Sequence, residues 1–249
     1  MKKKIYFASD FHLGIPDREM SLKREKLVVK WLDEIKRDAA EVYLMGDMFD
    51  FWFEYRTVVP KGYTRLLGKI AELCDSGIPV TLFTGNHDMW MFDYLENELG
   101  VRIFRKPVTR EFSGKKFFLA HGDGLGPGDH GYKFIKKVFA SPVCQWLFAR
   151  IHPNLGIGIA NYWSRRSRTA NGEKETFKGE ENEYLVQFVK HTLKKEYFDY
   201  FIFGHRHLPL QIQINRSWYI NLGEWVNYFT YAVFDGEKLE LKKYEPAAD

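Results

Sequence analysis

Short apolar runs alternate along the chain with longer segments in which apolar residues recur at helical spacing. Apolar runs bounded by polar or turn residues predict buried strands, whereas apolar residues three and four positions apart predict amphipathic helices. The predicted strands lie at residues 5–8, 42–45, 79–84, 116–120, 200–203, 210–214, 218–222, 230–234 and 238–244. The predicted helices lie at residues 22–38, 63–75, 91–99 and 180–195. This alternation of strands and helices predicts an α/β fold.

The composition is typical of one folded domain of 249 residues, of which 45% are hydrophobic and 17% aromatic. That share of apolar residues can fill a large core, so we expect a single domain over residues 1–249. Only Cys74 and Cys144 are present, without motif spacing, so neither a disulfide scaffold nor a zinc–thiolate site is expected. The apolar run before Asp10 is too short for a signal peptide, and no run is long enough to span a membrane. We therefore expect a cytoplasmic protein, either soluble or peripheral on the inner face of the inner membrane.

Positive charge is concentrated in one segment. The net charge is +4, and residues 132–168 contain seven Lys or Arg and no Asp or Glu, so this segment accounts for the whole excess. Two apolar groups at helical spacing lie in the same segment: Phe134, Ile135, Val138 and Phe139, and then Trp146, Leu147, Phe148 and Ile151. We interpret residues 129–174 as a helical insertion within the domain.

This insertion is compatible with three interpretations. It could pack its apolar side on the core and leave a solvated basic face. It could be a lid with one apolar and one cationic side, which suits an anionic lipid or the surface of an anionic membrane. It could bind nucleic acid, but that partner explains the aliphatic and aromatic residues poorly. The lid accounts for both features, so no nucleic acid is expected as a partner; the oligomeric state is left open.

Five short polar motifs each follow a predicted strand. They are "DFH" at 10–12, "GDMFD" at 46–50, "GNHD" at 85–88, "HGD" at 121–123 and "GHRH" at 204–207. Because ligands bind at the carboxyl ends of strands in open α/β sheets, five such ends can converge on one point. Each motif alone is common in ordinary turns, but the Asp, His and Asn side chains together suit two divalent cations such as Mn²⁺, Fe²⁺, Co²⁺ or Zn²⁺. Carboxylates beside a buried strand, such as Asp47 and Asp50, cost free energy unless something pairs with them.

In this order the motifs resemble those of the calcineurin-like metallophosphoesterases. The resemblance implies a two-sheet α/β sandwich flanked by helices, with two metal ions at the strand ends. By motif position, the ligands of the first ion would be Asp10, His12, Asp47 and His207. Those of the second would be Asp47, Asn86, His121 and His205, so that Asp47 bridges the ions. Two such ions lower the pKa of a water molecule, which then attacks phosphorus without a covalent phosphoenzyme.

Two further residues have catalytic roles under this resemblance. His87 would stabilise the charge that builds on the phosphoryl oxygens or would protonate the leaving group. Asp50 would accept a hydrogen bond from His87 and so fix the tautomer of its ring. Neither residue is expected to bind a metal ion.

Four stretches resemble a narrower group of these enzymes, which hydrolyses UDP-2,3-diacylglucosamine in lipid A synthesis. They are "DHGY" at 129–132, "SRTANGEK" at 167–174, "GDMFDFW" at 46–52 and "NLGEW" at 221–225. The resemblance implies cleavage of a diphosphate to UMP and 2,3-diacylglucosamine 1-phosphate at a dimanganese site, with the acyl chains held by a helical lid. The implied substrate contacts are Asp129, Tyr132, Ser167, Asn171 and Lys174.

Two alternatives stay open. Many members of that group carry arginine at the position of His87. The chain could therefore belong to a related branch that acts on another phosphate ester, including nucleotide or nucleic-acid phosphodiesters. A non-catalytic binding protein on the same fold is a further alternative, but such proteins typically lose metal ligands, and this chain retains all seven.

Overall fold

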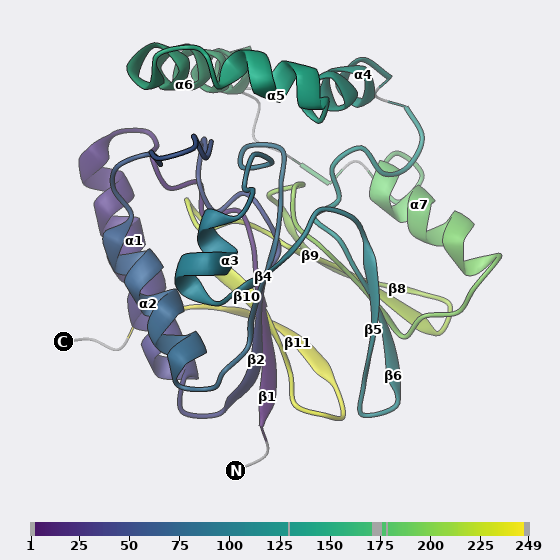
Figure 1. Ribbon diagram of the computed structural model, residues 1–249. Coiled ribbons are helices and arrows are strands. Elements are labelled where there is room, and N and C mark those ends of the chain that lie inside the picture. The colour runs from purple at the N-terminus through teal and green to yellow at the C-terminus, as the bar shows by residue number, and fades with distance from the viewer. Residues whose placement is uncertain (1–2, 129, 171–175, 178, 247–249) are drawn as a thin grey trace.

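Two β-sheets lie face to face, with helices on their outer faces (Figure 1). The computed structural model describes residues 3–128, 130–170, 176–177 and 179–246, and their side chains except those of residues 165–170. In spatial order, the first sheet contains β11 (Leu239–Lys243), β10 (Thr230–Phe234), β1 (Lys4–Ala8), β2 (Ala39–Leu44), β3 (Val80–Phe83) and β4 (Arg102–Phe104). The second contains β5 (Val108–Phe112), β6 (Lys115–Leu119), β7 (Tyr200–Phe203), β9 (Ser217–Leu222) and β8 (Pro209–Ile214). The predicted two-sheet α/β sandwich is confirmed.

Helices cover both sheets and one end of the sandwich. In chain order they are α1 (Arg18–Ile35), α2 (Thr64–Asp75), α3 (Tyr94–Leu99), α4 (His130–Phe139), α5 (Pro142–Phe148), α6 (Pro153–Ala170) and α7 (Tyr184–Leu193). Helices α1, α2 and α3 lie on the outer side of the first sheet, and α7 lies on the outer side of the second (Figure 1).

Strand direction brings the motif-bearing loops to one end of the molecule. Strands β1, β2, β3 and β4 are parallel to one another, and so are β6, β7 and β9. Parallel strands present their carboxyl ends at the same edge of a sheet. The loops after β1, β2, β3, β6 and β7, which carry the five motifs, therefore meet there.

Aromatic side chains form much of the core. Between the sheets, Phe7 stacks on Tyr43 at a ring-centroid distance of 5.2 Å and lies 6.2 Å from Phe117 of the second sheet. Under α1, the rings of Trp31 and Trp225 lie 5.1 Å apart, and both are fully buried. Buried side chains of α7 pack on β7 and β9. Each large apolar side chain buried in this way contributes roughly 1.5–3 kcal/mol to folding.

Some element boundaries differ from the predicted ones. Helix α1 begins at Arg18 rather than at residue 22, because Asp17 caps it: Met20 N donates to Asp17 Oδ1 at 2.9 Å. Strands β4 and β5 were not predicted. Strand β4 has only three residues, and β5 is an edge strand with alternating exposure, so neither gives a run of apolar residues.

Helices α4, α5 and α6 form a layer across the end of the sandwich at which the motif-bearing loops lie (Figure 1). We call this layer the lid. The ring of Phe148 lies 4.8 Å from those of Phe53 and Trp90, and Trp90 Nε1 donates to the Phe139 carbonyl at 2.9 Å. No residue of α4 or α5, both within the described part of the chain, is buried. The lid therefore contacts the rest of the molecule without burying any residue of α4 or α5.

Most large apolar side chains of the lid are exposed. The exposed fraction is 68% for Phe134, 56% for Trp146 and 60% for Trp163. This exposure disagrees with the interpretation in which the insertion packs its apolar side on the core. Exposed apolar surface of this extent is typical of a site that receives a lipid, a ligand or another surface. None of the helices in the described part of the chain combines the length and the apolar character needed to cross a bilayer.

Candidate metal centre

Backbone hydrogen bonds join the motif-bearing loops to one another. Asp10 N donates to the Gly46 carbonyl at 3.0 Å, which joins the loops after β1 and β2. Gly204 N donates to the His121 carbonyl at 2.9 Å, which joins the loops after β6 and β7. Loops that are far apart in the sequence are thereby fixed side by side.

Four of the predicted ligands gather around one point. The Nε2 atoms of His12 and His207 lie 3.0 Å apart. His207 Nε2 lies 3.2 Å from Asp10 Oδ1, and His12 Nε2 lies 4.0 Å from Asp47 Oδ2. The potential ligand atoms of these four residues all lie within 4.8 Å of one another. They are the residues that the sequence predicts for the first ion.

A second group adjoins the first and shares Asp47 with it. The potential ligand atoms of Asp47, His121 and His205 lie within 4.8 Å of one another. His121 Nε2 lies 3.4 Å from Asp47 Oδ2 and 3.3 Å from Asn86 Oδ1. Because Oδ2 of Asp47 faces a histidine of each group, it occupies the place of a bridging carboxylate. The fold therefore brings all seven predicted ligands together, and their binding of metal stays a prediction.

The backbone is strained at this site. Five of the predicted ligands have a positive φ: Asp10 (57°), His12 (43°), Asp47 (53°), His205 (64°) and His207 (50°). Residues other than glycine rarely adopt this left-handed conformation, which costs on the order of 1–3 kcal/mol each. Strain concentrated in this way is typical of functional sites, where the direction of a side chain matters more than local stability.

Two glycines leave room for the ligand side chains. A Cβ atom on Gly46, which has a φ of 102°, would lie 2.6 Å from Nδ1 of His121. A Cβ atom on Gly85 would overlap the carboxylate of Asp47. Any other residue at these positions would displace His121 or Asp47.

Asp88 organises two of the loops, although the sequence analysis gives it no role. Its buried carboxylate accepts hydrogen bonds from the N–H groups of Gly85 and Met48, both at 2.8 Å, and of Asp47 at 3.3 Å. Burial, reinforced by the nearby carboxylate of Asp47, raises the pKa of Asp88 to about 7. The sequence contains a signal for this structural role of Asp88. The residue ends the "GNHD" motif, and a carboxylate beside a buried strand needs hydrogen-bond donors.

The carboxylates and imidazoles of the site shift one another's pKa. Burial alone would lower the pKa of His12 and of His121, but nearby carboxylates raise both to about 10. Those of Asp10, Asp50 and Asp47 act on His12, and those of Asp47, Asp10 and Asp123 act on His121. Burial alone would raise the pKa of Asp47, yet the surrounding histidines hold it well below its usual range. The same attraction acts on a divalent cation, so protons and metal ions compete for these atoms.

The donor atoms of the site suit divalent cations. Asp47 Oδ2 is buried and accepts no hydrogen bond from the residues that the structure describes. A buried acceptor of this kind is costly unless a cation meets it. His121 Nδ1 donates to the Met45 carbonyl at 2.8 Å, which leaves the lone pair of Nε2 directed toward Asp47. Carboxylate, amide and imidazole donors in this combination fit the predicted pair of ions.

His87 lies beside the first ligand group, but its partner on Asp50 differs from the predicted one. His87 Nδ1 donates to the backbone carbonyl of Asp50 at 3.0 Å, whereas the carboxylate oxygen lies 3.7 Å away. The carboxylate of Asp50 accepts from Ser164 Oγ of the lid at 2.9 Å. Asp50 therefore accepts the hydrogen bond of His87, as predicted, but through its backbone carbonyl and not through its carboxylate. The turn after β2 directs the carbonyl at the ring, and the carbonyl fixes the same tautomer.

Tyr132 is the one predicted substrate contact whose side chain is described. Its ring lies 6.1 Å from that of His205, and its hydroxyl donates to Asp123 Oδ2 at 2.6 Å. Tyr132 therefore lies at the edge of the second ligand group. The side chains of the other predicted contacts lie outside the described residues: Asp129, Ser167, Asn171 and Lys174.

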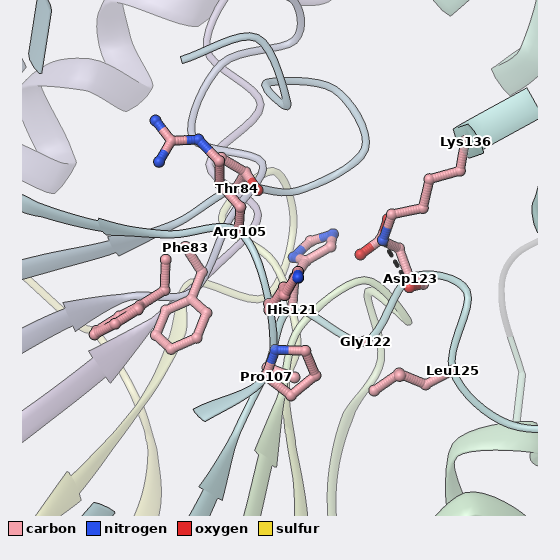
Figure 2. Close-up of a pocket in the computed structure, with 12 residues that line it drawn as sticks. Phe83, Thr84, Arg105, Pro107, His121, Gly122, Asp123, Leu125 and Lys136 are labelled. Atoms are coloured by element: carbon pink, nitrogen blue, oxygen red, sulfur yellow. Dashed lines mark hydrogen bonds and ion pairs between the residues drawn. The ribbon is translucent and has the colours of Figure 1, made fainter. Parts of the chain in front are cut away.

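A small cavity of about 60 Å³ opens beside the second ligand group (Figure 2). His121 and Asp123 line it from the loop after β6, Arg105 and Pro107 line it from the end of β4 onward, and Lys136 reaches it from α4. Figure 2 shows the side chain of Lys136 extending from the lid to Asp123. The lid and the motif-bearing loops therefore meet at this point.

Known proteins resemble this chain along nearly its whole length. The family model of the calcineurin-like phosphoesterases matches residues 3–209. A Porphyromonas gingivalis protein named UDP-2,3-diacylglucosamine hydrolase is 41% identical over 260 residues, covering 98% of this chain and 99% of that protein. A protein of the same name from Histophilus somni is 26% identical, covering 90% of this chain and 92% of that protein. Among solved structures, an archaeal phosphodiesterase aligns over 96% of this chain and 98% of its own, with 14% identity and a TM-score of 0.48. The match to the family model and the identity to the first relative show that this chain belongs to the calcineurin-like phosphoesterases.

Proposed function

We propose that this protein hydrolyses the diphosphate of UDP-2,3-diacylglucosamine in lipid A biosynthesis, which releases UMP and 2,3-diacylglucosamine 1-phosphate. The observation that carries the proposal is the position of the metal-ligand groups beneath a lid with exposed apolar side chains. A hydrolase of water-soluble esters needs only the metal ligands, whereas a lipid-linked substrate needs both features. The similarity to two proteins named for this activity supports the proposal.

The ligand residues provide the electrostatic part of the reaction. Two divalent cations would withdraw charge from the phosphoryl oxygens and lower the pKa of the attacking water. One cation would be held by Asp10, His12 and His207, and the other by Asn86, His121 and His205. Both cations would be held by Asp47. The contacts of Asp88 with the loops and of the Met45 carbonyl with His121 keep these side chains in place.

We propose that His87 acts on the substrate rather than on a metal, even though one of its ring nitrogens lies within 4.8 Å of potential ligand atoms of His12 and Asp50. The Asp50 carbonyl holds its Nδ1, and its Nε2 has no hydrogen-bond partner among the described residues. Its side chain is 19% exposed, whereas that of His12 is 3% exposed. In the protonated form, Nε2 donates to a phosphoryl oxygen or to the leaving oxygen. Burial lowers the pKa of His87, and the negative charge of a bound diphosphate favours the protonated form.

The lid offers a surface for acyl chains. Phe134, Trp146 and Trp163 each expose more than half of their accessible surface, and covering them with acyl chains removes apolar area from water on both partners. A buried methylene contributes about 0.8 kcal/mol. Binding energy gained far from the phosphorus can orient the reacting groups and so raise the rate as well as the affinity.

We further propose that the native ions are Mn²⁺. The mixture of carboxylate, amide and imidazole donors suits Mn²⁺, Fe²⁺, Co²⁺ and Zn²⁺, and the resemblance to the lipid A enzymes favours manganese. Chelator-treated protein reloaded with each ion at equal free concentration tests the choice. A lower kcat/KM with Mn²⁺ than with another of these ions would contradict it.

We also propose that the protein associates peripherally with the inner face of the inner membrane, where its lipid-linked substrate would lie. The lid combines exposed aromatic residues with exposed cations such as Lys137 and Arg150, a combination that suits an anionic membrane surface. The protein should sediment with phosphatidylglycerol vesicles, and less so with phosphatidylcholine vesicles or at high salt. Equal binding to both kinds of vesicle would exclude the electrostatic contribution.

Substitution of the shared carboxylate should affect both ions at once. Asp47→Asn removes one negative charge from each ligand group, so we expect loss of bound metal and a fall in activity of roughly 100-fold or more. Metal analysis and kcat/KM of the same preparations provide the measurement. Asp33→Asn, on the exposed side of α1, is the matched control and should change neither quantity. Near-normal turnover of Asp47→Asn with Mn²⁺ or Co²⁺ would show that Asp47 does not bridge two ions.

Substitution of His87 should lower the rate without releasing metal. We expect His87→Ala to reduce kcat by about 10²–10⁴-fold, the usual contribution of a general acid or base, with both metal equivalents retained. His87→Arg, which keeps a donor for the phosphoryl oxygens, should be more active than His87→Ala. The exposed His191 provides the control as His191→Ala. Loss of one metal equivalent from His87→Ala would instead make His87 a ligand.

The lid should distinguish acylated from soluble substrates. We expect UDP-2,3-diacylglucosamine to be hydrolysed far better than UDP-N-acetylglucosamine or a single-stranded oligonucleotide. The double variant Phe134→Ser/Trp146→Ser should lower kcat/KM for the acylated substrate by roughly tenfold or more, because apolar contact is lost, and should spare a small aryl phosphodiester. Tyr197→Ser, which alters a half-exposed aromatic residue outside the lid, is the control. Equal rates with acylated and unacylated sugars, or a preference for the oligonucleotide, would contradict the lipid substrate.

A further inference from the structure

Asp123 is a nearly buried carboxylate at the edge of the metal centre. It ends the "HGD" motif, two residues after His121, and it belongs to none of the three groups of potential metal ligands among the described residues. It is 7% exposed, and its side chain faces Lys136 of helix α4 (Figure 2). A carboxylate that is nearly buried in this way needs donors, and it obtains them from the lid.

Two side chains of α4 converge on this carboxylate. The Tyr132 hydroxyl donates to Asp123 Oδ2 at 2.6 Å. Lys136 Nζ lies 2.6 Å from the same oxygen and also donates to the Asp123 carbonyl at 3.1 Å. A third side chain of α4 contacts the same loop, because Lys133 Nζ donates to the Gly126 carbonyl at 2.6 Å. Residues one turn apart on α4 thus bind one short loop.

These polar contacts matter because α4 lacks a buried apolar face. None of its residues, all of which the structure describes, is buried, so burial of apolar surface contributes little to its position. At its carboxyl end, the Phe139 carbonyl accepts the hydrogen bond of Trp90. Toward its amino end, the contacts with Asp123 and Gly126 fix the helix to the loop after β6. That loop also carries His121, so the position of α4 is tied to the metal centre.

We infer that Asp123 is a positioning residue, which holds helix α4 over the metal centre through Tyr132 and Lys136 and so keeps the lid where an acylated substrate binds. The effect on the acylated substrate rests on the proposed function, whereas the effect on α4 does not. Asp123 acts through the lid and is assigned no contact with the reacting phosphate.

The test compares Asp123→Asn and Lys136→Met with the control Lys137→Met. Lys137 is exposed, is the next residue along α4 and makes no ion pair or hydrogen bond with any described residue. Amide hydrogen exchange is measured over residues 130–139 in metal-loaded protein without substrate. Exchange in this helix should be faster in Asp123→Asn and Lys136→Met and unchanged in Lys137→Met. The effect of the double variant on exchange should be smaller than the sum of the two single effects, because both substitutions break the contact between Lys136 and the Asp123 carboxylate.

Kinetics supply the second measurement. For Lys136→Met, kcat/KM for the diacyl substrate should fall by about tenfold, mainly through KM, as expected for the loss of one coupled pair of side chains. Hydrolysis of bis(4-nitrophenyl) phosphate by the same variant should stay within about twofold, because the metal ligands are untouched.

The outcomes separate this inference from the proposed function. Unchanged exchange of α4 in both Asp123→Asn and Lys136→Met would overturn the positioning role, whatever the substrate. Equal slowing of the diacyl and aryl substrates in Lys136→Met would also overturn it, because the defect would then lie in the metal centre. Faster exchange of α4, combined with failure of the wild-type protein to hydrolyse the diacyl substrate, would support the positioning role and reject the proposed function.

Discussion

The carboxylate of Asp47 is fully buried, and one of its oxygens has no hydrogen-bond donor among the described residues. A buried anion costs several kcal/mol unless opposite charge meets it, and the two predicted divalent cations would supply such charge. His12 and His121 approach the same oxygen from two different loops. Loops from both sheets thus supply side chains around this one buried charge.

That convergence makes the local backbone less stable. Most of the predicted ligands adopt a left-handed conformation that residues other than glycine avoid. The parallel strands on which the loops are mounted fix the ends of each loop, and Asp88 joins the loops after β2 and β3 through their N–H groups. The strain is therefore compensated by the packed sheets below and by a carboxylate that binds no metal in our assignment.

The lid is held in place by different interactions from those that hold the core. The sandwich is held together by buried aromatic side chains. The lid instead rests on aromatic contacts of Phe148 and on hydrogen bonds of Tyr132 and Ser164 to carboxylates beside the predicted ligands. An element with so little buried apolar surface opens at a lower free energy than the core does. This arrangement leaves the apolar residues of the lid exposed, and in our inference it makes the position of the lid sensitive to the loops that carry the predicted ligands.

The sequence determined which residues form the candidate metal centre and the end of the sheets where they lie. Apolar runs that stop at "GD", "GNHD" or "HGD" place those side chains at strand ends, and parallel strands bring such ends together whatever the length of the connections. The segment rich in Lys and Arg also predicted a helical insertion. Sequence patterns could not predict strands β4 and β5, because short or half-exposed strands leave no apolar run.

Only the tertiary structure decided which atoms meet. The backbone carbonyl of Asp50, not its carboxylate, accepts from His87, because the direction of a peptide group depends on the dihedral angles of the turn. Asp88 and Asp123 are sequence neighbours of predicted ligands, yet one binds backbone N–H groups and the other binds the lid. The reason is the same in each case. Charge and hydrophobic periodicity are properties of the sequence, whereas the direction in which a hydrogen-bond donor or acceptor points is fixed only when distant segments pack against one another.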